Sequence, residues 1–237
     1  MRHFIDLHLR DPGEEQLLRE MLETTVKLGF NSVAVSSEVT TIEDLRGYAS
    51  DIGLDLVSRL DLRPRNSNEL IIDLRRKRKS FEIVAVECNT KSVARQAAKD
   101  HRVDILTFPF NRGKRKTWFD KQEATLAAGT NCAYEFNLSE LLVGDDDRWD
   151  VMMGRIRQDI ENAMRVGVPV VTSSGAQHPL GLRDPRTLAS VMSLFDLDEE
   201  EGLDTVSLNP KRILKRNRDK LAPGFVVPGV REVSGCP

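Results

Sequence analysis

The segment VPVVTSSGAQHPLGLRDPRTLASVM, residues 168–192, contains a complete strand, loop and helix unit. Residues 168–171 form a short β-branched apolar run, which is typical of a strand buried on both faces. A polar loop follows, and Asp184 before Pro185 matches a helix N-cap with proline at the first helical position. Apolar residues then recur at helical spacing, at Leu188, Val191, Met192 and Phe195. The segment therefore predicts one βα unit of an α/β protein.

The same alternation of short β-branched runs and longer helical patterns continues along the whole chain. Candidate strands begin near Phe4, Ser32, Leu54, Phe81, Ile105, Ala133, Val168 and Asp204. Amphipathic helical patterns separate them, at residues 14–28, 42–52, 91–100, 120–128, 148–166 and 186–194. Strand and helix in repeated succession predict a parallel sheet with right-handed crossovers. Eight strands match the closed (β/α) barrel, which needs about 250 residues.

Charged residues within the candidate strands favour the barrel over an open sheet. Arg59, Glu82, Glu87 and Glu135 fall within or at the ends of these strands. Central strands of an open doubly wound sheet are apolar on both faces, whereas the mouth of a small barrel accommodates charged side chains. We therefore predict a single TIM-like α/β barrel over residues 1–220, followed by a tail at 221–237, and keep the open sheet as the alternative.

The charge of the chain is nearly balanced overall but uneven along its length. The net charge is −2, from 35 Lys and Arg against 37 Asp and Glu. Residues 61–116 carry 15 basic and 7 acidic residues, and residues 205–220 carry 6 basic residues and one acid. Blocks of like charge usually form solvated faces, but two basic blocks on an otherwise acidic chain favour a nucleic-acid partner.

The cysteines and the hydropathy indicate the cellular setting. Cys88, Cys132 and Cys236 have no CxxC spacing and are odd in number, so we expect reduced thiols rather than a disulfide framework or a zinc site. The sequence contains no apolar run of 18 residues and no signal peptide. We expect a soluble cytoplasmic protein.

Basic residues cluster in the loops that follow the carboxyl ends of the candidate strands, where barrel proteins place their sites. We predict that these loops bind RNA through Arg10, Arg63, Arg65, Arg112, Lys114, Arg115, Lys116, Ser173, Ser174, Arg183 and Arg186. Gly113 and Gly175 would let backbone amides approach a phosphate. Nearby aromatic residues could stack on unpaired bases, namely Phe108, Phe110, Trp118 and Phe119. For Phe108 and Phe110 the alternative is a place in the core.

The opening Asp6-Leu7-His8-Leu9-Arg10 resembles the Asp-x-His-x-His start of metal-dependent phosphoesterases of the polymerase and histidinol phosphatase family. In that family the histidines bind a metal, but Arg10 replaces the second one here, and a cation beside a metal position repels the metal. His3, His101 and His178 are the other histidines in the chain. We predict neither a metal site nor a catalytic residue, since Ser173, Ser174 and His178 form no recognisable triad. A metal-dependent phosphoesterase remains the alternative function.

Several motifs together resemble ribonuclease P protein component 3, the archaeal counterpart of the 30 kDa eukaryotic subunit. They are the opening at Phe4 to His8, Thr107-Phe108-Pro109-Phe110, Ser173-Ser174-Gly175-Ala176 with Leu182-Arg183-Asp184-Pro185-Arg186, and Val206-Ser207-Leu208-Asn209-Pro210. The resemblance covers nearly the whole chain. It implies a TIM-barrel-like fold and a heterotetramer with component 2 that binds the ribonuclease P RNA. It also implies 5′-leader removal from precursor tRNA by that RNA with its Mg²⁺ ions, so that the protein itself is non-catalytic and binds no cofactor.

Two further possibilities stay open. A protein-binding scaffold without affinity for RNA is the third hypothesis for the whole chain. The run Arg75-Arg76-Lys77-Arg78-Lys79 precedes a candidate strand, so in a barrel it lies at the end opposite the basic loops. It could serve RNA, a protein partner or solvent.

Overall fold

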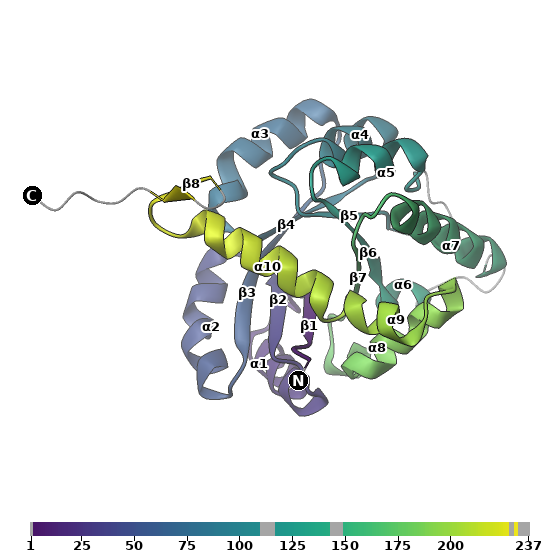
Figure 1. Cartoon of the computed structure of the whole chain (residues 1–237). Helices are drawn as coiled ribbons and strands as arrows, with labels where there is room; N and C mark the ends of the chain where they lie inside the picture. The colour runs from purple at the N-terminus through teal and green to yellow at the C-terminus, as the bar shows by residue number, and fades with distance from the viewer. Residues whose placement is uncertain (1, 110–116, 143–148, 228–229, 232–237) are drawn as a thin grey trace, which may run out of the picture.

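A parallel sheet of seven strands forms the centre of the molecule in our computed structural model, which describes residues 2–109, 117–142, 149–227 and 230–231. The strands pair in the order of the chain and curve into a barrel with helices outside (Figure 1). They are β1 (Ile5–Arg10), β2 (Ser32–Ser36), β3 (Asp55–Leu62), β4 (Ile83–Glu87), β5 (Ile105–Thr107), β6 (Ala133–Asn137) and β7 (Val170–Ser173). All seven start within two residues of the predicted positions.

The barrel closes between β1 and β7 through a few specific contacts. Leu9 and Ala176 form an isolated parallel bridge. The Arg10 amide donates to the Ala176 carbonyl at 2.8 Å, and the Gly175 amide donates to the His8 carbonyl at 3.0 Å. The buried carboxylate of Asp6 accepts the Ser174 amide at 3.2 Å. The prediction of a single TIM-like α/β barrel is confirmed.

Helices follow most strands and pack against the outside of the barrel. They are α1 (Glu15–Leu28), α2 (Val39–Asp51), α3 (Ser67–Lys77), α4 (Lys91–Ala98), α5 (Lys121–Ala128), α6 (Leu138–Leu142), α7 (Trp149–Arg165), α8 (Pro185–Val191), α9 (Glu199–Thr205) and α10 (Leu208–Leu221), with 3-10 turns η1 (Arg78–Ser80), η3 (Pro179–Gly181) and η4 (Met192–Phe195). Asp184 caps α8 as predicted, and its carboxylate accepts from the amides of Arg186 and Thr187. Within the described residues, no helix is long and apolar enough to cross a membrane.

The prediction of an eighth strand near Asp204 is wrong. These residues belong to α9, whose start is fixed by a capping box between Asp198 and Glu201. The chain then enters α10, which lies across one end of the barrel (Figure 1). Ile213 and Leu214 of this helix join the apolar cluster inside the barrel, beside residues such as Ile5. A helix therefore seals the interior of the barrel.

Polar contacts fix α10 to the amino ends of the strands. Arg218 binds Asp55 at the start of β3 and Glu82 just before β4, at N–O distances of 2.8 and 2.7 Å. The Asn217 amide group donates to the Glu82 carbonyl at 2.8 Å. Acidic residues at this end of the barrel thus hold the basic helix in place.

After α10 the chain forms a short antiparallel hairpin of β8 (Phe225–Val227) and β9 (Val230–Arg231). A tail that begins near residue 221 stays a prediction. Cys88 and Cys132 are buried free thiols, and burial raises the pKa of Cys132 to about 12. Cys236 lies outside the described residues.

Candidate functional site

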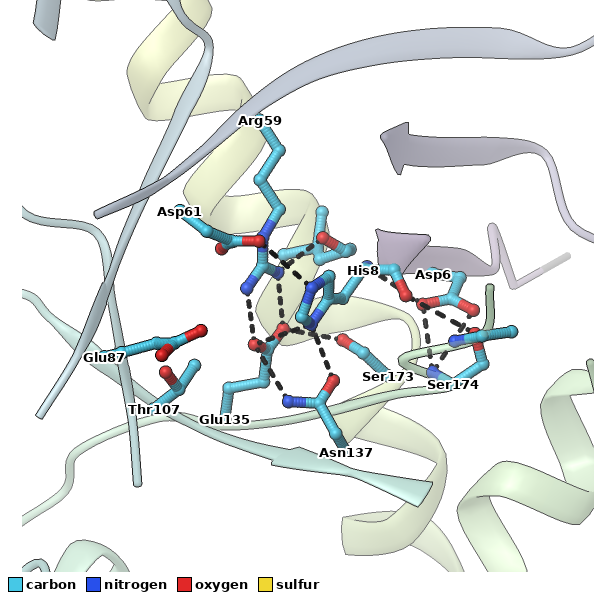
Figure 2. A network of polar contacts seen from close by, with 12 residues as sticks. Asp6, His8, Arg59, Asp61, Glu87, Thr107, Glu135, Asn137, Ser173 and Ser174 are labelled. Atoms are coloured by element: carbon cyan, nitrogen blue, oxygen red, sulfur yellow. Dashed lines mark hydrogen bonds and ion pairs between the residues drawn. The ribbon is translucent and has the colours of Figure 1, made fainter. Parts of the chain in front are cut away.

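Six polar side chains, all buried except the partly buried Asp61, gather inside the barrel at the carboxyl ends of the strands (Figure 2). This group, the mouth cluster, consists of His8, Arg59, Asp61, Glu135, Asn137 and Ser173. Strand alternation explains its position, because every second residue of a barrel strand faces inward. On β3 the inward series begins with apolar Val57 and ends with Arg59 and Asp61, and β6 repeats the pattern from Ala133 to Glu135. Both strands therefore contribute apolar side chains to the base of the barrel and polar side chains to its mouth.

A β-bulge brings His8 into the mouth cluster. Asp6 pairs with Val33 and Leu9 pairs with Val35, so two residues of β1 lie opposite the single residue Ala34. Leu7 joins the interior apolar cluster, and the His8 ring also turns inward to meet Asp61. Asp6, between the inward-facing Ile5 and Leu7, lies on the other face by ordinary alternation, next to Ser174 at the end of β7 (Figure 2).

The guanidinium of Arg59 binds two carboxylates at the centre of the mouth cluster. It makes two parallel contacts of 2.7 Å with Glu135 and one of 2.8 Å with Asp61. It also donates to the Leu7 carbonyl at 2.6 Å. Arg59 and Glu135 are fully buried. Such bidentate pairing is geometrically specific and strong, and it satisfies charges that would be costly to bury alone.

His8 carries the second positive charge of the cluster. Its Nε2 lies 3.1 Å from Asp61, and its Nδ1 lies 2.8 Å from the side-chain oxygen of Asn137. Burial and the neighbouring Arg59 each favour the neutral ring, but attraction and hydrogen bonds from Asp61 and Glu135 outweigh them and raise the pKa of His8 to about 9. His8 is therefore protonated at neutral pH.

The pKa values of the two carboxyl groups in the cluster are lowered. Burial alone would raise the pKa of Glu135, but Arg59 and His8 lower it to about 2. The pKa of Asp61 is also held well below its usual range, against burial, by the charges of Arg59 and His8. Two cations thus balance two carboxylates inside the mouth cluster.

The mouth cluster does not fit a metal ion. His8, Asp61 and Glu135 are ligand types, but Arg59 occupies the space between the two carboxylates and His8 is protonated. Within the described residues no group of three His, Cys, Asp or Glu side chains is placed to hold a metal. The cation that faces the carboxylates is Arg59, whereas our sequence argument against a metal rested on Arg10.

Some predicted RNA-binding residues lie exposed on loops at the carboxyl ends of the strands. Arg65 and Arg186 are exposed, and neither forms an ion pair among the described residues. Arg63 is 68% exposed and binds Glu87 at 2.6 Å. Arg183 is half-buried and donates to the carbonyls of Leu180 and Leu182. The half-buried Arg10 has a buried Nε without a hydrogen-bond partner in the described structure.

Ser173 and Ser174 are instead buried and turned into the protein. The Ser173 hydroxyl donates to Glu135 at 2.8 Å, and the Ser174 hydroxyl accepts from the Ala176 amide at 3.2 Å. The Gly175 amide is also used internally, at the His8 carbonyl. Burial argues against direct phosphate contacts by these residues, so we leave them out of the proposed RNA surface. The exposed His178 accepts from the Leu180 amide.

The basic loop with Arg112, Lys114, Arg115 and Lys116 lies outside the described residues, as do Phe110 and Gly113. Its RNA-binding role stays a prediction. The alternative core interpretation is confirmed for Phe108, which packs with Tyr134. Phe119, which was predicted to stack on bases, is also buried against Tyr134 and is not available for stacking. Trp118 is half-buried, and its ring centroid lies 4.8 Å from the Arg155 guanidinium carbon and 5.2 Å from the Lys91 nitrogen.

Sequence reasoning missed the mouth cluster as a unit. Arg59, Glu87 and Glu135 were recognised only as charged strand residues that favour a barrel. The usable signal was their position near the ends of candidate strands, because all such ends meet at one mouth.

Comparison with known proteins gives consistent matches over the chain. The model of a family described as RNase P subunit p30 matches residues 3–222. Ribonuclease P protein component 3 of Methanosarcina mazei is 26% identical over 225 residues, which are 94% of this chain and 92% of the relative. Ribonuclease P protein subunit p30 of Mus musculus is 26% identical over 235 residues, covering 90% of this chain and 85% of the mouse protein.

A solved structure shows the same fold. A chain in a cryo-EM structure of archaeal ribonuclease P with mature tRNA superposes with a TM-score of 0.82. It is 20% identical, and the match covers 98% of both chains.

Proposed function

The chain belongs to the RNase P subunit p30 family, and from this premise we propose that it is a non-catalytic subunit that binds and stabilises the ribonuclease P RNA. The ribonuclease P particle, which contains this RNA and its protein subunits, removes 5′ leaders from precursor tRNA. The RNA and its Mg²⁺ ions perform the chemistry, and the protein binds no cofactor of its own. The protein acts in the cytoplasm.

The pairing of Arg59 with Asp61 and Glu135 carries the non-catalytic part of this proposal. In a barrel enzyme the mouth is where substrate meets catalytic groups. Here the mouth cluster is fully buried at Arg59 and Glu135, and the carboxylates are bound by a guanidinium. A carboxylate held in this way is a poor general base and a poor metal ligand. The mouth cluster therefore stabilises the fold. Exposed cations such as Arg65 and Arg186 lie on the loops at the same end of the barrel.

The proposed partners follow from family membership. We propose that the chain assembles with component 2 into a heterotetramer and meets precursor tRNA only within the holoenzyme. The runner-up function, a metal-dependent phosphoesterase, has no supporting donor set in the mouth cluster. Stoichiometric Mn²⁺ bound by purified protein and lost in His8→Ala would reinstate it.

Reconstitution tests the proposal directly. Precursor tRNA cleavage is measured with the RNase P RNA and the other protein subunits, with and without this chain. We expect the chain to increase cleavage at low Mg²⁺, because its cations replace metal ions in neutralising the folded RNA. Equal cleavage with and without the chain, under conditions where the other subunits stimulate it, would refute the proposal.

The basic loop gives a second test. We predict that changing Arg112, Lys114, Arg115 and Lys116 together to alanine weakens RNA binding and reduces its salt dependence, because each lost phosphate contact releases about one counterion fewer. Filter binding over a range of KCl concentrations measures both quantities. Unchanged affinity of a correctly folded variant would exclude this loop from the RNA surface.

A further inference from the structure

Basic residues from distant parts of the chain meet at the amino end of the barrel, opposite the loops considered so far. Arg78 belongs to the basic run at 75–79, and Arg216 belongs to α10 in the second basic block. Both bind the fully buried Asp104, at N–O distances of 3.2 and 2.8 Å. Lys220 lies close by, since burial and then the charges of Arg216 and Arg78 lower its pKa despite the opposing effect of Asp104. Two cations therefore bind this carboxylate, and Lys220 lies about one helical turn beyond Arg216 on α10.

Two of these cations, Arg216 and Lys220, line a groove between α10 and the β8–β9 hairpin. The groove has a volume of about 700 Å³ and is lined by Arg212, Lys215, Arg216, Lys220 and Arg231, together with Phe225 and Val227. Asp219 is the one acid in this lining, and it lies 3.6 Å from Arg231. In the part of the chain that the structure describes, Arg212, Lys215 and Lys220 form no ion pair. Arg216 and Arg231 have acidic partners, whereas the charges of Arg212, Lys215 and Lys220 are not balanced by an ion pair among the described residues.

The cations form a stripe along one face of α10. Positions 212, 215, 216 and 220 follow helical spacing, so their side chains lie on one side of the helix over about 12 Å. A basic stripe along a helix is the electrostatic footprint of nucleic-acid binding, because successive phosphates meet successive cations. Phe225 adds an aromatic ring at the wall of the groove, to which a base can stack.

We infer that the groove between α10 and the β8–β9 hairpin binds the phosphate backbone of RNA. It forms a second RNA surface at the end of the barrel opposite the loops with Arg65 and Arg186. This inference rests on the proposed RNA-binding function and adds a location to it. A barrel with RNA contacts at both ends can hold two separate segments of one folded RNA.

The triple variant Arg212→Ala, Lys215→Ala, Lys220→Ala tests the inference. It keeps Arg216 and Arg218, which bind the acidic residues at the amino ends of the strands, so the barrel end stays assembled. The probe is labelled RNase P RNA from the organism that encodes the chain, titrated at KCl concentrations from about 0.05 to 0.3 M. We expect affinity to fall about 10-fold or more, and the slope of log K against log salt to decrease in magnitude by about two to three.

Two controls separate specific contacts from net charge. The variant Lys27→Ala, Arg157→Ala, Arg165→Ala removes the same charge from exposed positions on α1 and α7 and is expected to bind nearly as the wild type does. The variant Arg212→Lys, Lys215→Arg, Lys220→Arg keeps the groove cationic and is expected to retain most of the affinity.

The outcomes are distinguishable. Failure of the wild-type protein to bind the RNA would overturn both the proposed function and this inference. Wild-type binding with equal affinities of the groove variant and the charge-matched control would overturn the inference alone. Unchanged RNA affinity with lost association to purified component 2 would also overturn it, by assigning the groove to a protein partner.

Discussion

Arg59 neutralises two carboxylates that the fold cannot solvate. Its guanidinium is fully buried and contacts both Glu135 and Asp61. Removal of one partner from a buried charge cluster leaves unpaired charge in a medium of low polarity, which is far more destabilising than loss of a surface ion pair. The stability of the barrel mouth therefore depends strongly on this one side chain.

We predict that Arg59→Met lowers the free energy of unfolding by about 3–5 kcal/mol. Urea denaturation followed by circular dichroism measures the change. Arg63→Met is the matched control, since Arg63 is 68% exposed and its pair with Glu87 is screened by water. Equal stability of the two variants would show that the buried pair is not required.

His8 makes the stability of the mouth cluster dependent on pH. The fold raises its pKa to about 9 from an ordinary value of 6.5, so the stabilisation is complete below pH 6.5 and is lost as the pH rises through 9. We predict that the wild type loses roughly 3 kcal/mol more than His8→Asn between pH 6 and pH 10. Chemical denaturation at both pH values gives the comparison, and parallel losses would contradict a charged His8.

At the scale of elements, α10 replaces the eighth strand of the expected barrel. Its apolar residues Ile213 and Leu214 fill the interior, and its basic residues bind the acidic ends of the strands. One helix therefore closes the core with one face, while another face presents to solvent Arg212 and Lys215, which form no ion pair among the described residues.

We predict that Ile213→Ala lowers the free energy of unfolding by about 2–5 kcal/mol, because it leaves a cavity at the base of the barrel. Leu221→Ala at the end of the same helix serves as control. Leu221 is 39% exposed, whereas Ile213 is 3% exposed, so the control is expected to cost less than about 1 kcal/mol. Similar losses in thermal and urea denaturation would contradict the sealing role of Ile213.

At the scale of the whole molecule, several acidic residues are buried whereas many basic residues are exposed. Acidic residues such as Asp104, Glu82 and Glu135 are buried and bind cations internally, while Arg65 and Lys215 remain exposed. A protein with a net charge of −2 can thus present positive surfaces at both ends of its barrel. Local charge, rather than net charge, determines its attraction to a polyanion.

This sorting explains how much the sequence could predict. The seven strands were found because buried parallel strands are short β-branched runs. The placement of α10 across the end of the barrel was not predicted, because residues 205–220 are dominated by basic residues and only a few side chains such as Ile213 indicate a buried face. The Arg59–Glu135 pair joins residues 76 positions apart, so no local pattern indicates it. Likewise, the meeting of Arg78 with Arg216 at Asp104 depends on barrel closure.

The sealing of the barrel by α10 has a consequence for synthesis on the ribosome. Once translation has passed Ser173, all seven strands of the barrel have been synthesised. The amino end of the barrel interior nevertheless stays open to water until residues 208–221 have emerged from the exit tunnel. The apolar side chains inside the barrel therefore stay uncovered while about 50 further residues, plus those that fill the tunnel, are synthesised. Exposed apolar side chains of this kind promote aggregation until α10 covers them.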